Sequence, residues 1–384
     1  MEAYLDNLAT TPLDPRVLAV MLPLLSGRPG NPHARVHSWG RAASEAVDAA
    51  RATVAGAMGV GVKADEVVFT PSATAANNLA LFGIAGARVK KGNHILVSAI
   101  EHPSVLGPAA ALALQGFDVE VMPVGADGIL DPETVRARLR PETILVSVMA
   151  VNNEVGTIQP VAAIRALLSR SGPVLHVDAS QAPGKIALAP LAEAADLLTL
   201  SGHKAYGPMG AAALVVRDRR SIRPRPVLIG GGQENGMWPG TLNVPAVVGL
   251  GEALRLCEAE RESDVARIAL LSQALLAAIQ EAFPGSARNG DPSRAVPHCL
   301  SVTVDGVAGE TLVALLAREG VGAALGSACA TEAAKPSHVL AALGIDSSRT
   351  RRTLRFGLGR FTTAEEIAFT GDVLRVFAAR LARV

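Results

Sequence analysis

The sequence is poor in cysteine, in aromatic residues and in net charge, and each shortage excludes a class of protein. Its three cysteines in 384 residues are too few, and odd in number, for a disulfide framework. A formal net charge of +1 gives no electrostatic case for direct binding to nucleic acid or to an anionic membrane. Aromatic residues make up only 3% of the chain, so we expect a core of alanine, valine, leucine and isoleucine.

Metal-site and targeting motifs are also missing. The chain has no Cys-x-x-Cys and no His-Glu-x-x-His, so a zinc site has little support and no metal is expected. No uninterrupted apolar stretch approaches the length of a membrane span. The start, Met1 to Asp6, lacks the basic residues and the apolar core of a signal peptide. We therefore expect a soluble, cytoplasmic protein.

What is present is an alternation of apolar runs with segments of helical spacing. With 49% apolar and 18% charged residues, the chain can bury a large core, and its length suggests two domains. Continuously apolar strands between helices predict an α/β fold with a mostly parallel sheet, in which ligands sit at the carboxyl ends of the strands. The expected strands are Glu66–Thr70, His94–Ile100, Val119–Val124, Thr143–Val151, Val174–Asp178, Asp196–Ser201 and Ala211–Val216.

The later part of the chain predicts a second domain. The pattern from Pro245 to Phe283 is long and helical, and we expect it to connect the two domains. Beyond it, strands are expected at Cys299–Val304 and Thr353–Gly357, with a helix at Gly309–Arg318 between them.

Lys204 is the most informative single residue. It follows directly on an expected buried strand, where a solvated charge is badly placed but a lysine of lowered pKa can bond to an aldehyde. Asp178 ends another expected strand. An amine and a carboxylate at two strand ends suit pyridoxal phosphate, whose aldehyde takes the lysine and whose ring nitrogen takes the aspartate. The alternative is that Asp178 caps a helix and Lys204 lies on a surface turn.

Other polar residues fall at the same strand ends, and each has a structural alternative. His102 could stack on a flat ring or simply cap the helix that Pro103 opens. The segment Ser72–Asn78, with Ala73 and Thr74, could hold a phosphate at a helix N-terminus or be an ordinary cap. Further phosphate donors would be Ser201 and His203, while the amides of Asn152 and Gln181 could reach the cofactor's phenolate oxygen or satisfy buried backbone groups.

Two residues of the second domain carry candidate chemistry. Cys329 lies among small and polar residues, as in a mobile loop, so it is a candidate nucleophile, whereas Cys257 and, less securely, Cys299 fit buried apolar positions. Arg355 is a lone arginine in an apolar strand. It could grip a substrate carboxylate or form a structural salt bridge.

Taken in order, these segments resemble the cysteine desulfurases of the NifS/IscS type, in the class V aminotransferase group of fold-type I pyridoxal-phosphate enzymes. The likeness covers nearly the whole chain. It is carried by the stretches Tyr4–Asn7, Ala9–Pro12, Asn31–Pro32, Glu101–Pro103, Val151–Gly156, His176–Gln181, Ser201–Pro208, Gly231–Glu234, Gly240–Thr241, Gly326–Cys329, Pro336–Leu340, Arg355–Phe356 and Leu358–Thr362.

The resemblance implies a fold and a set of roles. We expect a large cofactor domain at 12–255 with a seven-stranded sheet, and a smaller α+β domain at 256–384, joined by 1–11, that carries the Cys329 loop. Lys204 would bind the cofactor's aldehyde, His102 would stack on its ring, and Arg355 would grip the substrate carboxylate. The cofactor would also contact Ala73, Thr74, Asn152, Asp178, Gln181, Ser201, His203 and, from the neighbouring subunit, Thr241. Asn152 would contact the substrate too.

The implied reaction converts L-cysteine to L-alanine. Lys204 would remove the α-proton, and the Cys329 thiolate would take the sulfur as a persulfide for iron–sulfur clusters, thio-cofactors or thiolated RNA. A homodimer and a sulfur-acceptor or scaffold protein are the expected partners. The alternatives are a related lyase or transaminase, such as a selenocysteine lyase, and a non-catalytic binding descendant.

The chain departs from the family pattern at several places. Ser72 replaces a glycine before the expected phosphate loop, Trp238 stands where an arginine is usual, and Asn235 where another arginine is common. Leu8 occupies a position usually held by a small residue, and Gly357 replaces a serine. These departures put the substrate range and the partner in question, whereas the lysine, aspartate, histidine and cysteine remain.

Overall fold

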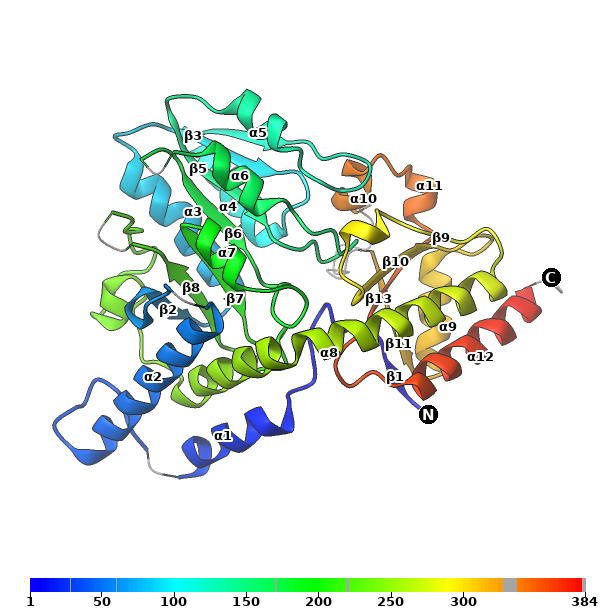
Figure 1. Cartoon of the computed structure of the whole chain (residues 1–384), viewed down its shortest axis with the longest axis horizontal. Coiled ribbons are helices and arrows are strands. Elements are labelled where there is room, and N and C mark those ends of the chain that lie inside the picture. Colours follow the sequence, from blue (N-terminus) through cyan, green and yellow to red (C-terminus); the bar gives the residue numbers. More distant parts are fainter. Residues whose placement is uncertain (28, 60, 170, 219–220, 327–336, 382–384) are drawn as a thin grey trace.

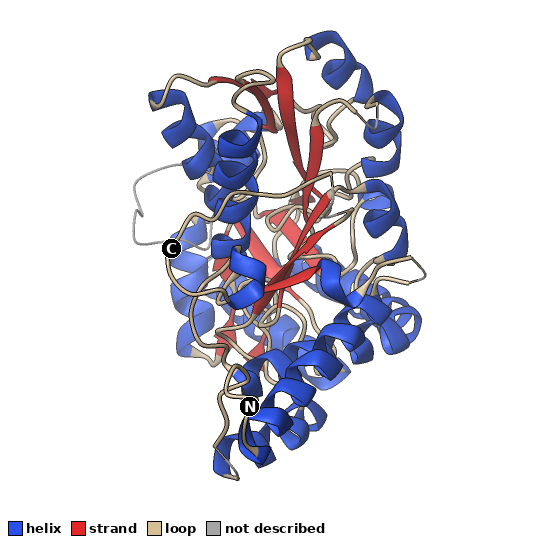
Figure 2. Cartoon of the chain, turned by 90° about the vertical axis from the view of Figure 1, so that its left-hand side faces the viewer, coloured by secondary structure: helices blue, strands red, loops and turns tan. Residues whose placement is uncertain are grey.

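The computed structural model describes residues 1–27, 29–59, 61–169, 171–218, 221–326 and 337–381. Figure 2 shows the strands inside the molecule and the helices mainly around them. The larger sheet has seven strands in the order β2-β8-β7-β6-β5-β3-β4. These are β2 (Val67–Thr70), β3 (His94–Ser98), β4 (Asp118–Met122), β5 (Thr143–Met149), β6 (Val174–Asp178), β7 (Leu197–Ser201) and β8 (Ala212–Val216).

The predicted mostly parallel sheet is confirmed. The pairs β3–β4, β3–β5, β5–β6 and β6–β7 are parallel, and only β8 runs antiparallel to its neighbours β7 and β2. Each of the seven expected runs forms a strand, because β-branched and aliphatic residues favour strands; six are buried throughout, whereas the edge strand β4 is only partly buried.

Helices cover both faces of this sheet. Val67 and Phe69 pack with α2 on one face, whereas Val68, between them, packs with α3 on the other. The alternation follows from the two-residue period of a strand. The helices of this part are α1 (Pro15–Ser26), α2 (Ser38–Ala57), α3 (Ala73–Arg88), α4 (Pro103–Leu114), α5 (Pro132–Arg138), α6 (Val161–Leu167) and α7 (Ala189–Ala194), with short 3-10 turns η1 (Ala64–Glu66) and η2 (Gln233–Gly236).

The second part has its own sheet and its own apolar core. Its four antiparallel strands follow the order β12-β13-β10-β9, and β1 pairs in parallel with β11 beside them. The elements are β1 (Ala3–Tyr4), β9 (Ala287–Arg288), η3 (Pro292–Arg294), β10 (Cys299–Thr303), α9 (Gly309–Arg318), β11 (Val321–Gly322), β12 (Ala324–Leu325), α10 (His338–Ala342), α11 (Ser347–Thr350), β13 (Thr353–Gly357) and α12 (Ala364–Leu381). The pairing of β1 attaches the first residues of the chain to this part.

Helix α8 (Val244–Ala282) joins the two parts. Figure 1 shows it running from beneath the large sheet to the second part, where α12 lies beside it. By length and composition alone α8 could cross a membrane. Its buried residues instead divide between the two cores, with Leu250 and Leu254 in the first and Ile268 and Leu275 in the second. The helix is continuous across the expected boundary at residues 255 and 256, and the division into domains stays a prediction.

Candidate active site

A cavity of about 380 Å³ opens at the carboxyl ends of the strands of the large sheet. The sequence predicts a ligand site at this edge, because strand ends of a parallel sheet meet there. The cavity is lined by Leu8, Ala9, Ser72, Ala73, Thr74, His102, Pro103, Ser104, Met149, Val151, Asn153, Glu154, Asp178, Ser180, Gln181, Ser201, His203, Lys204, His338 and Arg355.

Lys204 and Asp178 both line the cavity, from adjacent strands. Asp178 ends β6 and pairs in register with Thr199 of β7, and Lys204 lies in the turn that follows β7. Asp178 accepts hydrogen bonds from the main-chain N–H and the Oγ of Ser180, at 2.9 and 2.6 Å, and from Asn77 Nδ2 at 2.8 Å.

These bonds decide the charge of Asp178. Burial by itself raises the pKa of this carboxyl, but the hydrogen bonds from Ser180 and Asn77 and the nearby charge of Lys204 together lower the pKa below its ordinary value. Asp178 is therefore held as a carboxylate inside a buried site, which suits a partner that carries a protonated ring nitrogen.

His102 caps a helix and also lines the cavity, and its stacking on a ring stays a prediction. Its Nδ1 accepts the N–H of Ser104 at 3.1 Å and so caps α4, and its ring lines the cavity as well. Burial, followed by the charge of Lys204, lowers the pKa of His102 to about 4. The imidazole is therefore neutral at physiological pH and can stack on a flat ring.

The residues Ala73, Thr74, Ser201 and His203, which were expected to bind phosphate, all line the cavity. Ala73 and Thr74 form the first turn of α3, which Ser72 caps by accepting the N–H of Ala75 at 3.1 Å. Ser201 and His203 line the same cavity. The Oγ of Ser201 is buried and has no hydrogen-bond partner in the described part of the chain, and the same holds for Oε1 of Gln181. Buried polar atoms that face a cavity without partners indicate a ligand.

Arg355 is 1% exposed, forms the salt bridge that was one of its two expected roles, and also lines the cavity, so its grip on a substrate carboxylate stays a prediction. Its Nη2 donates to Asp6 Oδ1 at 2.7 Å, and its Nη1 donates to the carbonyl oxygen of Asn153 at 3.0 Å. Its Nε is buried without a partner among the described residues. The guanidinium is therefore held in place by two of its five N–H groups, and the remaining N–H groups can bind an anion.

Asn152 does not line the cavity. Its Oδ1 accepts the N–H groups of Glu154 and Val155, at 2.8 and 3.0 Å, and its Nδ2 donates to the carbonyl of Ile100 at 3.0 Å. The amide thus holds the turn after β5 together, and the neighbouring residue Asn153 lines the cavity instead. The expected contacts of Asn152 with cofactor and substrate stay a prediction, and the turn places Asn153 at the cavity surface.

Two further predicted residues are not found in the cavity lining, one of them because it is not described. Thr241 is exposed and lines a separate surface hollow with Thr70, Pro71 and Trp238, so it does not reach this cavity. Cys329 lies outside the described residues. Cys257 and Cys299 are fully buried, and burial raises the pKa of their thiols to about 11 and about 12. Both are therefore poor nucleophiles.

The sequence reasoning missed several residues of the site. Asn77 and Ser180 hold Asp178, and Glu154 accepts a hydrogen bond from Ser337 Oγ. His338 lines the cavity, with Nε2 2.9 Å from the carbonyl oxygen of Glu101. A carbonyl oxygen only accepts, so Nε2 carries the proton of this bond. Asn77 falls within the Ser72–Asn78 segment and the others within stretches that carry the resemblance, but nothing local assigns them a role.

Two departures from the family pattern contact one another. A Cβ at position 357 would lie 2.7 Å from the main-chain nitrogen of Leu8 and 3.0 Å from its Cγ. A serine therefore does not fit at Gly357, because its Cβ would meet the main-chain nitrogens of Leu8 and, at 2.8 Å, of Asn7. Ser72 is the N-cap of α3, so the loss of a glycine there leaves the helix start capped.

Comparisons with known proteins agree with this geometry. The family model for class-V aminotransferases matches residues 3–369. A mitochondrial cysteine desulfurase of Arthroderma benhamiae is 45% identical over 95% of this chain and 72% of its own length. Another, of Drosophila melanogaster, is 43% identical over 96% of this chain and 79% of its own.

Solved structures are similar over almost the whole chain. A NifS-like protein superposes with a TM-score of 0.91 at 32% identity, covering 99% of this chain and all of the other. SspA in complex with cysteine gives a TM-score of 0.80 at 34% identity, covering 94% of this chain and all of the other. The two curated relatives are named mitochondrial, so the expectation of a cytoplasmic location is wrong.

Proposed function

Because this chain belongs to the class-V aminotransferase family, we propose that it is a pyridoxal-phosphate-dependent cysteine desulfurase, as its curated relatives are named. The observation that carries the proposal is that one cavity contains Lys204, Asp178, His102 and Arg355. An amine, an ionised carboxylate, a neutral ring and a buried guanidinium together match an amino acid bound to this cofactor.

The residues of the cavity fit the cofactor. The buried Oγ of Ser201 and the first turn of α3, at Ala73 and Thr74, would hold the phosphate, since a helix N-terminus favours an anion. The ionised Asp178 would hold the ring nitrogen, and the unpaired amide oxygen of Gln181 marks a polar contact that remains to be made. When bound, the cofactor supplies an electron sink at the substrate's α-carbon.

The protein's own residues would then bind the substrate and move its proton. Arg355, already fixed by Asp6 and Asn153, would hold the carboxylate of L-cysteine through its remaining donors. Lys204 would take the α-proton. Cys329, which lies outside the described residues, would receive the sulfur as a persulfide, leaving L-alanine as the product. SspA, whose structure was solved with cysteine, supports this choice of substrate.

We extend the proposal to a homodimer that delivers sulfur to an acceptor or scaffold protein for iron–sulfur clusters or thio-cofactors. Thr241 is exposed and lines a surface hollow together with Thr70 and Pro71. Thr70 ends β2, and Pro71 directly precedes Ser72, which caps α3. A residue in that place can serve the phosphate end of a neighbouring subunit's cavity. Sedimentation of the purified protein tests the dimer, and a monomer at micromolar concentration would contradict it.

The deciding experiment is incubation of the holoprotein with L-cysteine, with mass measurement of released alanine and of the intact protein. We expect one equivalent of alanine and one sulfur adduct that maps to Cys329. The variant Cys329→Ala should lose the adduct and the turnover. Full alanine release by this variant would instead favour a lyase that does not use Cys329.

A further inference from the structure

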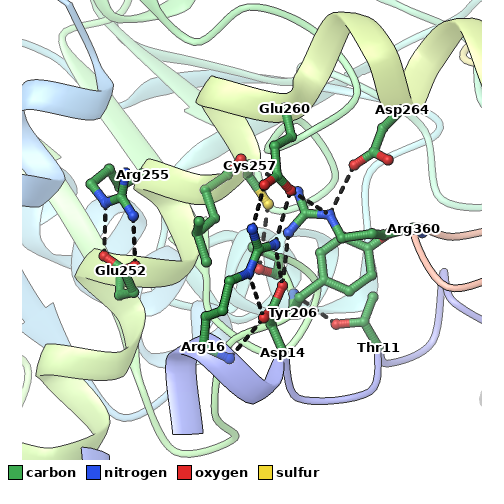
Figure 3. Close-up of polar contacts among 12 residues, drawn as sticks. Thr11, Asp14, Arg16, Tyr206, Glu252, Arg255, Cys257, Glu260, Asp264 and Arg360 are labelled. Carbon is green, nitrogen blue, oxygen red and sulfur yellow. Dashed lines mark hydrogen bonds and ion pairs between the residues drawn. The ribbon is translucent and has the colours of Figure 1, made fainter. Parts of the chain in front are cut away.

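Arg360 is the centre of a network of charges that lies apart from the cavity (Figure 3). Its side chain is 7% exposed. Nε donates to Asp264 Oδ2 of α8 at 2.9 Å, and Nη1 donates to Asp14 Oδ2, at the start of α1, at 3.1 Å. The side chain of Arg360, from the loop after β13, therefore connects α8 with the start of α1.

The same network includes a second arginine. Arg16 donates to Asp14 Oδ2 at 2.8 Å and to Glu260 Oε2 of α8 at 2.9 Å. The hydrogen bonds from Arg16 are the main reason that the pKa of Asp14 is lowered to about 2. Arg16 is 49% exposed, so it forms the solvent-facing edge of the network, whereas Arg360 forms its buried centre.

Arg360 also contacts Tyr206, two residues after Lys204. Its guanidinium carbon lies 4.7 Å from the centre of the Tyr206 ring, and its main-chain N–H donates to Tyr206 Oη at 2.7 Å. Tyr206 has a φ of +59°, a conformation that costs energy for a residue with a bulky side chain. The contacts with Arg360 therefore hold a strained position in the turn that carries Lys204.

The other side of this turn is held by the N-terminal segment. Thr11 donates to the carbonyl of His203 through its N–H at 2.8 Å and its Oγ1 at 2.9 Å, and it accepts the N–H of Tyr206 at 2.8 Å. Asp14 donates its own N–H to the carbonyl of Tyr206 at 3.0 Å. Asp14 thus contacts two partners: its main-chain N–H binds the turn, and its carboxylate binds the side chain of Arg360.

Arg360 follows closely after the strand that carries Arg355. We propose that Arg360 is a positioning residue that fixes the Lys204 turn relative to β13, an inference that rests on the roles proposed above for Lys204 and Arg355. A substrate held by its carboxylate at Arg355 presents its α-carbon to Lys204 only if the separation of these two elements is constant. A misplacement of about 1 Å is enough to slow a reaction by about 100-fold.

The test compares Arg360→Gln with Arg16→Gln, a control that removes a charge from the same network without touching Tyr206. We expect Arg360→Gln to lower kcat by about 10- to 100-fold. In the apoprotein it should speed amide exchange in the peptide 201–208 by about tenfold, as expected for a locally loosened segment. Arg16→Gln should leave both quantities within about twofold of wild type, and Arg360→Lys, which keeps a cation over the ring, should recover part of the loss.

The proposal is overturned if Arg360→Gln keeps the wild-type amide-exchange rate in 201–208 and the wild-type kcat. It is also overturned if Arg16→Gln changes both quantities as much as Arg360→Gln does, because that would indicate a general loss of stability. If Arg360→Gln does not fold, Tyr206→Phe serves instead, because it removes only the Oη that accepts the main-chain N–H of Arg360. We expect this variant to speed amide exchange in 201–208, and an unchanged exchange rate contradicts the inference. Absence of cofactor binding in the wild type would contradict the proposed function, and the exchange of the apoprotein would still decide the role of Arg360.

Discussion

The cavity and the Arg360 network are two polar regions at the junction of the same two parts of the chain, and they differ in how completely their polar atoms are paired. In the cavity, Ser201 Oγ, Gln181 Oε1 and Arg355 Nε are buried without partners in the described chain. In the network, the buried polar atoms of the described residues Asp14 and Arg360 all have partners. An unpaired buried group costs about 1–3 kcal/mol, so it persists where a ligand completes it.

The acids of the two regions show the same difference. Glu101, which precedes His102 in the chain, is fully buried. Desolvation raises the pKa of its carboxyl to about 8, although Ser98 and Met149 donate hydrogen bonds to it. Burial likewise raises the pKa of Glu154 to about 7. Asp14, bonded to two arginines, has a pKa of about 2. Burial therefore shifts Glu101 and Glu154, near the cavity, toward protonation, whereas hydrogen bonds and neighbouring cations keep Asp178 and Asp14 ionised.

The largest effect is expected where the cavity loses its amine. Lys204→Ala should reduce alanine release by about 1,000-fold or more, because the group proposed to move the α-proton is gone. The visible absorption of the bound cofactor should change with it. Alanine release and the absorption spectrum are the measurements, and turnover at the wild-type rate would remove Lys204 from the mechanism.

Arg355→Lys should raise the KM for L-cysteine by about 10- to 100-fold, with a smaller change in kcat. A lysine is a point charge, so it cannot bond to Asp6, Asn153 and a substrate carboxylate in one plane as the guanidinium can. Steady-state kinetics provide the check. As a control, Asp6→Asn keeps an oxygen acceptor for Arg355 and should shift the KM less. An unchanged KM in Arg355→Lys would place the substrate carboxylate elsewhere.

The acids allow a test through stability. The pKa of Glu101 is raised from 4.5 to about 8, so between these pH values the folded state holds a proton that the unfolded state has lost. Its contribution to the free energy of unfolding is therefore complete below pH 4.5 and is lost as the pH rises to about 8. The loss is on the order of a few kcal/mol, because one pKa unit corresponds to about 1.4 kcal/mol.

Glu101→Gln should remove most of this decline, since an amide oxygen can still accept from Ser98 and Met149. Urea unfolding of the apoprotein at pH 5 and at pH 8.5 measures it. Glu252→Gln removes a half-buried, ion-paired acid of α8, serves as the control and should retain the wild-type slope. If Glu101→Gln declines as steeply as the wild type, Glu101 is ionised in the fold.

The smallest effect is expected at the exposed side of α8, beside the network. Arg255 is 54% exposed and pairs with Glu252 three residues before it. Such a pair contributes about 0.3–0.5 kcal/mol, so Arg255→Gln should change the urea midpoint only slightly. If Arg255→Gln lowers the urea midpoint as much as Arg360→Gln does, the exposed Arg255 pair and the buried Arg360 pairs do not differ in their contribution to stability.

Much of the fold and of the site could be predicted from local sequence. All seven expected strands of the large sheet form, and Lys204, Asp178, His102, Ser201 and Arg355 all line one cavity. The first four end or follow strands of the parallel sheet, whose ends converge at one edge, whereas Arg355 comes to the cavity from β13 of the second sheet. That Asn153 lines the cavity while Asn152 closes the turn on the carbonyl of Ile100 could not be predicted, because it depends on a contact between residues 52 positions apart.

The sequence by itself determined the strands and the residues at their ends, since burial of apolar runs and the two-residue period of a strand are local properties. Only the tertiary structure decided which of these residues are paired and which remain open. The contacts of Arg360 with Asp14 and Tyr206, and of Ser337 with Glu154, join segments more than 150 residues apart. No local pattern encodes such contacts, because they arise from the packing of two parts around one cavity.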